Sequence, residues 1–259
     1  MDLGIKNRRA IVCASSQGLG LACATSLARE GCVVFINGRG ESRLAQAMAQ
    51  IEAATGVRAT PVVADINTEP GRATLIAACP EPDILVNNNA GPPPGELADW
   101  DHAAWLSALE ANMLAPILLI RALLPGMRQR RFGRIVNITS AMVKSPRAHM
   151  GLSTAARTGL TALCKALVPE VAKDNVTINN LLPERIDTGR QRFLTERMMR
   201  MENITFEEAR ARIADSIAAK RFGRPEEFGD ACAYLCSEQA GFISGQNLQL
   251  DGGSYRGLI

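Results

Sequence analysis

The sequence is short of several residue types that would direct it towards particular chemistry or partners. Its 259 residues include two histidines, two tyrosines and two tryptophans, and aromatic residues make up only 4%. The histidines, His102 and His149, lack the neighbouring ligands of a metal site, so no bound metal is predicted. The net charge of +3 is too small to indicate binding to nucleic acid or to a membrane surface.

Long apolar runs are lacking as well. The longest, residues 113–120, is interrupted by Pro116 and is much shorter than the roughly 20 residues that cross a bilayer. The opening residues carry charge without an apolar stretch, so no secretory signal is expected. No membrane association is therefore predicted, and a cytoplasmic location is the expectation.

The cysteines form no C-x-x-C pair, which argues against a redox motif or a zinc site. They number seven; six lie in apolar segments and Cys79 lies near a loop. Buried, reduced thiols are expected, as in most cytoplasmic proteins. The six are Cys13, Cys23, Cys32, Cys164, Cys232 and Cys236.

The sequence does contain a regular alternation of short β-branched runs and longer amphipathic segments, which is typical of βαβ units. The predicted fold class is α/β: a single Rossmann-type doubly wound domain over residues 1–259, with a seven-stranded parallel sheet and helices on both faces. Strands are expected at 10–14, 33–37, 60–64, 84–87, 134–139, 176–181 and 247–250. Helices are expected at 18–30, 42–54, 69–78, 102–111, 113–130, 152–173 and 225–237.

A helical insertion, about residues 189–219, breaks this alternation before the last unit. Thr205 and Glu208 have the T-x-x-E spacing of a capping box, which predicts a helix that begins near Phe206. The insertion follows the sixth strand, at the sheet edge where ligands bind. It is interpreted either as a substrate lid or as rigid packing helices.

A glycine-rich turn joins the first predicted strand to the first predicted helix. Such a turn lets backbone N–H groups approach a phosphate at the start of a helix. Its place in the first βα unit makes it a specific signal for a dinucleotide. The residues expected to contact the cofactor here are Ser15, Gln17, Gly18, Leu19 and Gly20.

These motifs resemble the short-chain dehydrogenase/reductase family, and within it the 3-oxoacyl-carrier-protein reductases. The family's T-G-x-x-x-G-x-G turn corresponds to residues 13–20. The resemblance implies an oxidoreductase that transfers hydride between NAD(P)(H) and a carbonyl or hydroxyl group. Further similarity lies, in order, at residues 83–88, Asn112, 135–140, 183–188, 243–246 and 251–253.

The resemblance also implies cofactor contacts outside the turn. Asp65 and Ile66 correspond to the pair that meets the adenine ring, and Asn88 and Asn89 to the segment under the adenosine ribose. Thr188 corresponds to the threonine that touches the nicotinamide carboxamide. The implied set is Asp65, Ile66, Asn88, Asn89, Ala90, Pro183, Ile186 and Thr188.

The end of the second predicted strand bears on the choice between NADP and NAD. The family places an acid here to bind the ribose 2′-hydroxyl of NAD, whereas this chain reads Asn37-Gly38-Arg39. Arg39 is suited to bidentate binding of a 2′-phosphate. NADP(H) is therefore favoured over NAD(H); the alternative is an exposed arginine near a helix start.

The family's catalytic tyrosine and lysine are both absent from this chain, which makes it a divergent member. Counted from the matching Ser140, the tyrosine position holds Ser153 and the lysine position holds Arg157. An aliphatic hydroxyl is a much weaker acid than a phenol, and arginine does not give up its proton in proteins. The candidate catalytic residues are Asn112, Ser140, Ser153 and Arg157.

Three further departures fall on the same cleft. Ala14 replaces the first glycine of the turn. Ala90 replaces the glycine of the family's N-N-A-G segment, unless one asparagine has been inserted there. Glu184 replaces a glycine after the sixth strand, where a carboxylate would be unfavourable beside a cofactor unless Arg185 turns it away.

The leading functional hypothesis is an NADP(H)-dependent reductase of a small carbonyl or thioester substrate. His149 and Lys144, just before Ser153, are either substitute proton donors or simply loop residues. The second hypothesis is a catalytically silent dinucleotide-binding or scaffold protein that oligomerises with active paralogues. Turnover of a short 3-oxoacyl thioester or a diketone distinguishes the two; lyase or isomerase chemistry is a third, without specific support.

A basic cluster follows the long helix expected at 113–130. Arg128, Arg130 and Arg131 are a candidate docking site for an acidic acyl-carrier protein, although basic residues also favour helix C-termini for dipole reasons. The family usually assembles as a tetramer through its long helices and its last strand. A homotetramer is therefore expected, and no nucleic-acid partner.

Overall fold

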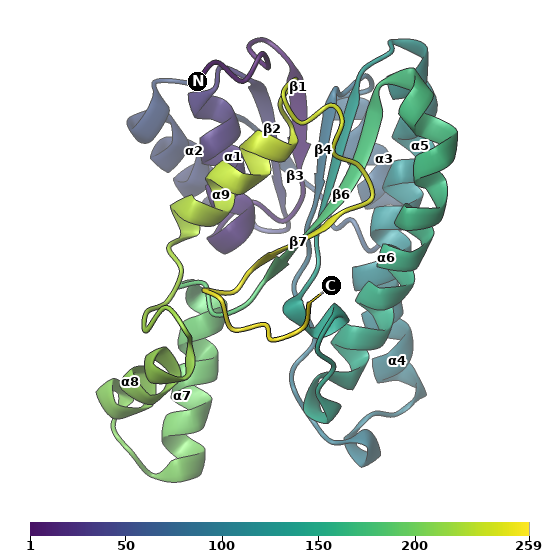
Figure 1. Ribbon diagram of the computed structural model, residues 1–259. Helices are drawn as coiled ribbons and strands as arrows, with labels where there is room; N and C mark the ends of the chain where they lie inside the picture. The colour runs from purple at the N-terminus through teal and green to yellow at the C-terminus, as the bar shows by residue number, and fades with distance from the viewer. Residues whose placement is uncertain (259) are drawn as a thin grey trace.

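The computed structural model describes residues 1–258, in which seven parallel strands form one sheet between two layers of helices (Figure 1). The strand order is β3-β2-β1-β4-β5-β6-β7. The order therefore reverses between β1 and β4, and a crevice opens above the carboxyl ends of strands at such a point. The predicted fold class and strand number are confirmed. The strands are β1 (Arg9–Val12), β2 (Val33–Gly38), β3 (Thr60–Val63), β4 (Ile84–Asn87), β5 (Gly133–Ile138), β6 (Val176–Pro183) and β7 (Asn247–Leu250).

Each face of the sheet buries an apolar core against its own helices. Leu27 of α1, Leu44 of α2 and Phe228 of α9 belong to one core. Leu75 of α3 and Leu119 of α5 belong to the other, together with side chains of α6. The helices are α1 (Gly18–Arg29), α2 (Glu41–Thr55), α3 (Glu69–Ala78), α4 (His102–Leu109), α5 (Ala115–Gln129), α6 (Gly151–Val171), α7 (Gly189–Glu202), α8 (Phe206–Ser216) and α9 (Pro225–Leu235).

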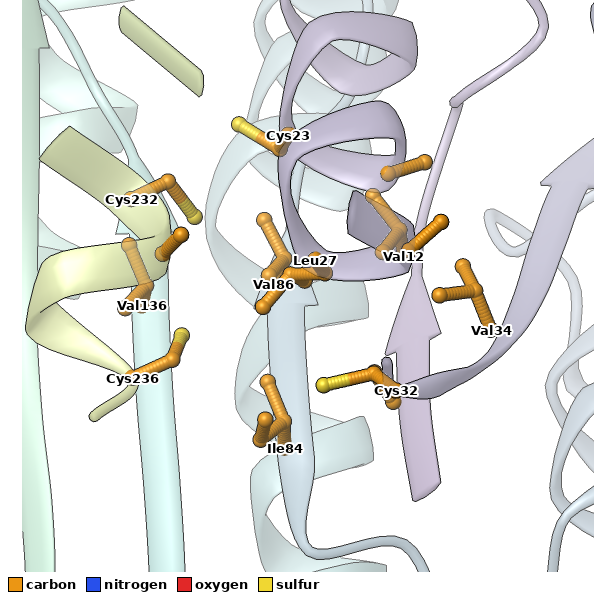
Figure 2. Packing of buried hydrophobic residues seen from close by; sticks show 14 of the residues in the cluster. Val12, Cys23, Leu27, Cys32, Val34, Ile84, Val86, Val136, Cys232 and Cys236 are labelled. Atoms are coloured by element: carbon orange, nitrogen blue, oxygen red, sulfur yellow. The ribbon is translucent and has the colours of Figure 1, made fainter. Parts of the chain in front are cut away.

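The seven cysteines are all free and buried, as predicted. Figure 2 shows Cys23 of α1 near Cys232 of α9, and below them Cys236, which follows α9, and Cys32, which precedes β2. Burial raises the pKa of Cys32 to about 12. Since the thiolate is the reactive form of cysteine, these thiols act as small apolar core residues.

A row of four asparagines runs across the neighbouring strands β4, β5, β6 and β7. Asn87, Asn137, Asn180 and Asn247 occupy one register on β4, β5, β6 and β7. Each side-chain amide donates to the next carbonyl oxygen, at 2.9, 2.9 and 2.8 Å. The row therefore links four strands by side-chain bonds in addition to the backbone ladder.

The inserted segment forms two helices, α7 and α8, that project from the carboxyl edge of the sheet (Figure 1). Thr205 Oγ1 accepts from the Glu208 N–H at 3.2 Å, and the Glu208 carboxylate accepts from the Thr205 N–H at 2.8 Å. The predicted capping box and the helix starting at Phe206 are confirmed. A small apolar cluster of Ile213, Ile217 and Phe222 packs this segment together.

One helical stretch within residues 1–258, His102–Gln129, has the length and composition of a membrane-crossing helix, with a mean hydropathy of 1.6. It comprises α4, a π-helical turn (Glu110–Leu114) and α5. Leu119, Leu123 and Met127 on its inner face are buried against the sheet. Leu106 and Leu114 on its outer face are exposed.

Candidate functional site

A large open cleft of about 1530 Å³ lies above the carboxyl ends of the central strands. One wall is the glycine-rich turn after β1 and the ends of β2 and β3. The other is the start of α6 and the segment from β6 into α7. This is the crevice that the strand order predicts for a dinucleotide.

The turn after β1 presents the start of α1 to the cleft. No side chain caps the first N–H groups of α1, which are therefore available to a phosphate. A Cβ at Gly20 would lie 2.5 Å from the Ala14 carbonyl oxygen, so only glycine permits this close approach of helix and turn. Gly18 has φ +59°, another conformation that favours glycine. These features fit the pyrophosphate of a dinucleotide.

Most of the predicted cofactor residues line the cleft, but Ser15 and Gly20 do not. The Ser15 hydroxyl is fully buried, donates to the Val12 carbonyl at 2.7 Å and accepts from the Asn37 N–H at 2.9 Å. Its side chain is therefore a support for the turn, and the neighbouring Ser16 faces the cleft instead. The lining residues predicted from the sequence are Gln17, Gly18, Leu19, Arg39, Asp65, Ile66, Asn88, Asn89, Ala90, Pro183, Ile186 and Thr188.

The end of the cleft beside β2 is positively charged. The residues at the carboxyl end of this strand, 37–39, include no carboxylate. The Asn37 amide donates to the Val62 and Ala64 carbonyls at 3.2 and 3.0 Å, so it is committed to the sheet. Arg39 and Arg43 are exposed, line the cleft and form no ion pair within residues 1–258. Arg43 was not predicted, although its place four residues after Arg39 at the start of α2 was a usable signal.

Ala14 adopts a left-handed conformation with φ +44°, at the position of the family's first glycine. An L-residue there pays about 1–2 kcal/mol, and glycine loses about 0.5–1 kcal/mol in entropy. We therefore expect Ala14→Gly to raise the free energy of unfolding by roughly 0.5–1 kcal/mol, measured by urea denaturation. An Ala22→Gly variant, within α1, should be destabilising instead. A lower free energy of unfolding for Ala14→Gly than for the unmodified protein would contradict the inference that the backbone at Ala14 is strained.

Ser140, which follows β5, and Ser153 and Arg157, which lie on α6, all line the cleft. Ser140 Oγ accepts from the Met142 N–H at 3.2 Å. Arg157, one turn along α6, donates a short hydrogen bond to Ser153 Oγ. Both side chains are buried, and burial, followed by the charge of Arg190, lowers the pKa of Arg157 to about 10. Arg157 is still charged at neutral pH, with no carboxylate beside it.

Asn112 lies behind these residues and not in the main cleft. It is buried in the π-helical turn, and its amide is 3.4 Å from the carbonyl oxygens of Ala90 and Ala108. A small cavity of about 10 Å³ separates it from Arg157. Asn112 therefore supports the cleft wall from behind, whereas Ser153 and Arg157 line the cleft.

Glu184 lines the cleft, and its carboxylate is paired with Arg147 and not with Arg185. The Arg147 guanidinium lies 3.1 Å from the Glu184 carboxylate, between the loop before α6 and the segment after β6. Arg185 has φ +58° and forms no ion pair within residues 1–258. The unfavourable carboxylate is thereby neutralised by a residue 37 positions away in sequence.

His149 is exposed and lines the cleft, whereas Lys144 does not line it. The Lys144 ammonium lies 5.3 Å from the centre of the Tyr255 ring. The sequence had not singled out Arg190 and Arg197, which α7 presents to the cleft. Their spacing of seven residues, which places both on one helix face, was the available signal.

The basic cluster at the end of α5 lies near the amino end of β5, at the opposite edge of the sheet from the cleft. Arg128 and Arg131 share Asp174, at 2.7 and 3.3 Å, and Arg130 donates to the Pro82 carbonyl at 2.6 Å. A strand of eight residues such as β6 spans about 26 Å. The structure therefore does not favour these arginines as a docking site for a carrier that serves the cleft.

Comparisons with known proteins agree with this geometry. The sequence pattern of the family described as enoyl-(acyl carrier protein) reductase matches residues 13–255. Dehydrogenase/reductase SDR family member 4 of Bos taurus is 34% identical over 257 residues, with 96% of this chain and 88% of the relative covered. The chain belongs to the short-chain dehydrogenase/reductase family. The uncharacterized oxidoreductase YvaG of Bacillus subtilis is 31% identical over 264 residues, with both chains covered completely.

Solved structures of this family superpose closely on the chain. L-sorbose reductase from Gluconobacter frateurii, complexed with NADPH and L-sorbose, has a TM-score of 0.93 at 29% identity, covering 100% of both chains. A 3-oxoacyl (acyl-carrier-protein) reductase from Agrobacterium tumefaciens C58 with NADP bound has a TM-score of 0.87 at 28% identity, covering 97% and 96%. The predicted resemblance to the short-chain dehydrogenase/reductase family is confirmed.

Proposed function

We propose that this protein is an NADP(H)-dependent reductase of carbonyl compounds in which Ser153 and Arg157 take the places of the family's tyrosine and lysine. The observation that carries the proposal is that Ser140 and the hydrogen-bonded pair of Ser153 and Arg157 line the same cleft as the glycine-rich turn. Structures of family members with NADPH support the same cofactor class.

These three residues have separate roles in the proposal. A nicotinamide dinucleotide bound in the cleft would supply hydride to a carbonyl carbon. Ser140 accepts from the Met142 N–H, which leaves its own proton for the substrate oxygen. Ser153 accepts from Arg157, so its proton also points to another acceptor and passes to that oxygen as hydride arrives. The Arg157 charge would stabilise the Ser153 alkoxide that this proton transfer leaves, and water in the open cleft would then protonate Ser153 again.

We propose NADP(H) over NAD(H) because Arg39 and Arg43 are both free at the β2 end. Loss of a charge-assisted hydrogen bond costs about 1.5–3 kcal/mol, or roughly 10- to 100-fold in affinity. Arg39→Ala should weaken NADPH binding by that factor and change NADH binding less than about twofold. A fluorescence titration measures both, with Arg58→Ala, an exposed arginine outside the cleft, as the control.

Either of two outcomes would contradict this part of the proposal. An equal loss for NADPH and NADH would place Arg39 against the adenosine and not against a 2′-phosphate. No binding of either cofactor to the unmodified protein would leave a silent scaffold as the better account. Turnover of a short 3-oxoacyl thioester or a diketone by the NADPH-loaded protein separates the enzyme from a scaffold that only binds.

Assembly, substrate class and cellular location are proposed from the same family membership. We propose a cytoplasmic homotetramer, a single domain per chain and a small carbonyl or thioester substrate. The exposed Leu106 and Leu114 on the outer face of the helices and Leu163 of α6 support pairing of these helices between copies. Light scattering after size-exclusion chromatography measures the assembly, and a monomer would contradict it. An acyl-carrier partner, if it delivers the thioester, must approach the mouth of the cleft.

A further inference from the structure

Three arginines on the substrate side of the cleft have no carboxylate partner. They are Arg157 on α6 and Arg190 and Arg197 on α7, and all three line the cleft. None forms an ion pair with any acidic residue within residues 1–258. Arginine guanidinium groups have a planar fork of donors that matches a carboxylate.

The polar partners of these arginines are neutral. Arg157 donates to the Ser153 hydroxyl. Arg190 donates to the Pro92 carbonyl at 2.8 Å, and Arg197 lies 3.5 Å from the Pro94 carbonyl. Each contact leaves the charge of the guanidinium uncompensated.

The four carboxylates that line the cleft form no ion pair with these three arginines. Glu184 pairs with Arg147 at 3.1 Å, and Glu202 pairs with Arg212 at 2.9 Å. Asp65 accepts from the Asn67 N–H at 3.1 Å, and Glu96 forms no ion pair within residues 1–258. Within the described residues, no carboxylate therefore lies within ion-pair distance of the three arginines.

The three arginines also act on each other. The charge of Arg190 contributes to the lowered pKa of Arg157, and the charge of Arg197 contributes to that of Arg190. Like charges held near one another in a partly water-excluded cleft favour binding of an anion. The phosphates of a dinucleotide have other positive groups available, at the start of α1 and at Arg39 and Arg43.

We infer that the substrate is an oxo acid, a carbonyl compound whose carboxylate is bound by Arg190 and Arg197 with Arg157 behind them. The inference rests on the proposed function for the carbonyl reduction itself. The carbonyl oxygen then lies at Ser140 and Ser153, and the carboxylate extends towards α7. Phe193, Leu194 and Met198 on the same helix give the carbon chain an apolar surface.

The test compares 2-oxopentanoate and acetoacetate, each with its methyl ester, by calorimetric titration of the NADP⁺-loaded protein. The acids should bind about 10- to 100-fold more tightly than the esters, as expected for charge-assisted bonds. Arg190→Gln and Arg197→Gln should each remove much of that preference and leave ester binding unchanged. Arg192→Gln is the matched control, because Arg192 of the same helix pairs with Glu196 at 3.1 Å and does not line the cleft.

NADPH affinity is measured for every variant, because this keeps the inference separate from the proposed function. Equal binding of acids and esters would overturn the inference, whatever the cofactor result. A loss of NADPH affinity in Arg190→Gln would also overturn it, because the arginine would then serve the cofactor. Failure of the unmodified protein to bind NADPH would overturn the proposed function alone, and titration of the cofactor-free protein would still test acid against ester.

Discussion

Ser153→Tyr combined with Arg157→Lys is expected to raise the kcat for a diketone by about 100-fold or more. A positioned general acid contributes roughly 10²- to 10⁴-fold, and a phenol next to an ammonium is a far better proton donor than a serine hydroxyl. Ser153 lines the cleft, so a larger side chain at this position is directed to the substrate side although Ser153 itself is buried. Ser140 and the cofactor turn are unchanged in the variant. The measurement is NADPH oxidation under saturating cofactor.

The matched control is Ser153→Phe with Arg157→Lys, which fills the same volume without a hydroxyl. If the gain comes from the phenol, this control should show no gain, and its turnover should fall below that of the unmodified protein because the Ser153 hydroxyl is lost. A gain in both double variants would mean that volume, and not acidity, limits turnover. No gain in either would show that the departures at Ala14, Ala90 and Glu184 limit catalysis as well.

The sequence predicted those parts of the molecule that depend on local pattern. The seven strands follow from short β-branched runs between amphipathic segments, and the start of α8 from the spacing of Thr205 and Glu208. The cleft walls at Gly18 and Ser140 follow from motif positions in their βα units. In each case the information lies within a few residues of the element it specifies.

The sequence failed where a side chain's role depends on a distant segment. Ser15 lies in the phosphate turn but faces Val12 and Asn37 in the core, a direction that local sequence does not encode. The pairing of Arg147 with Glu184 joins two loops that only the finished sheet brings together. Arg190 and Arg197 of α7 line the cleft together with residues of β2, β5 and α6 that are distant in sequence.

The asparagine row predicts the largest effect on stability. Asn137 is fully buried, accepts from the Asn87 amide and donates to the Asn180 carbonyl oxygen, both at 2.9 Å. Asn137→Ala would leave two buried polar groups without partners, each at a cost of about 1–3 kcal/mol. The free energy of unfolding, measured by urea denaturation, should therefore fall by roughly 2–6 kcal/mol.

The position of each asparagine in the sheet provides the control for this prediction. Asn247 ends the row on the edge strand β7 and is only partly buried, so water can replace its bond to the Asn180 amide. Asn247→Ala should cost about 1 kcal/mol or less, the net worth of one ordinary hydrogen bond. Equal losses for the two variants would mean that the row acts as separate bonds. A much greater fall in the free energy of unfolding for Asn137→Ala would show that a hydrogen bond of the row contributes more to stability when it is buried at the centre of the sheet.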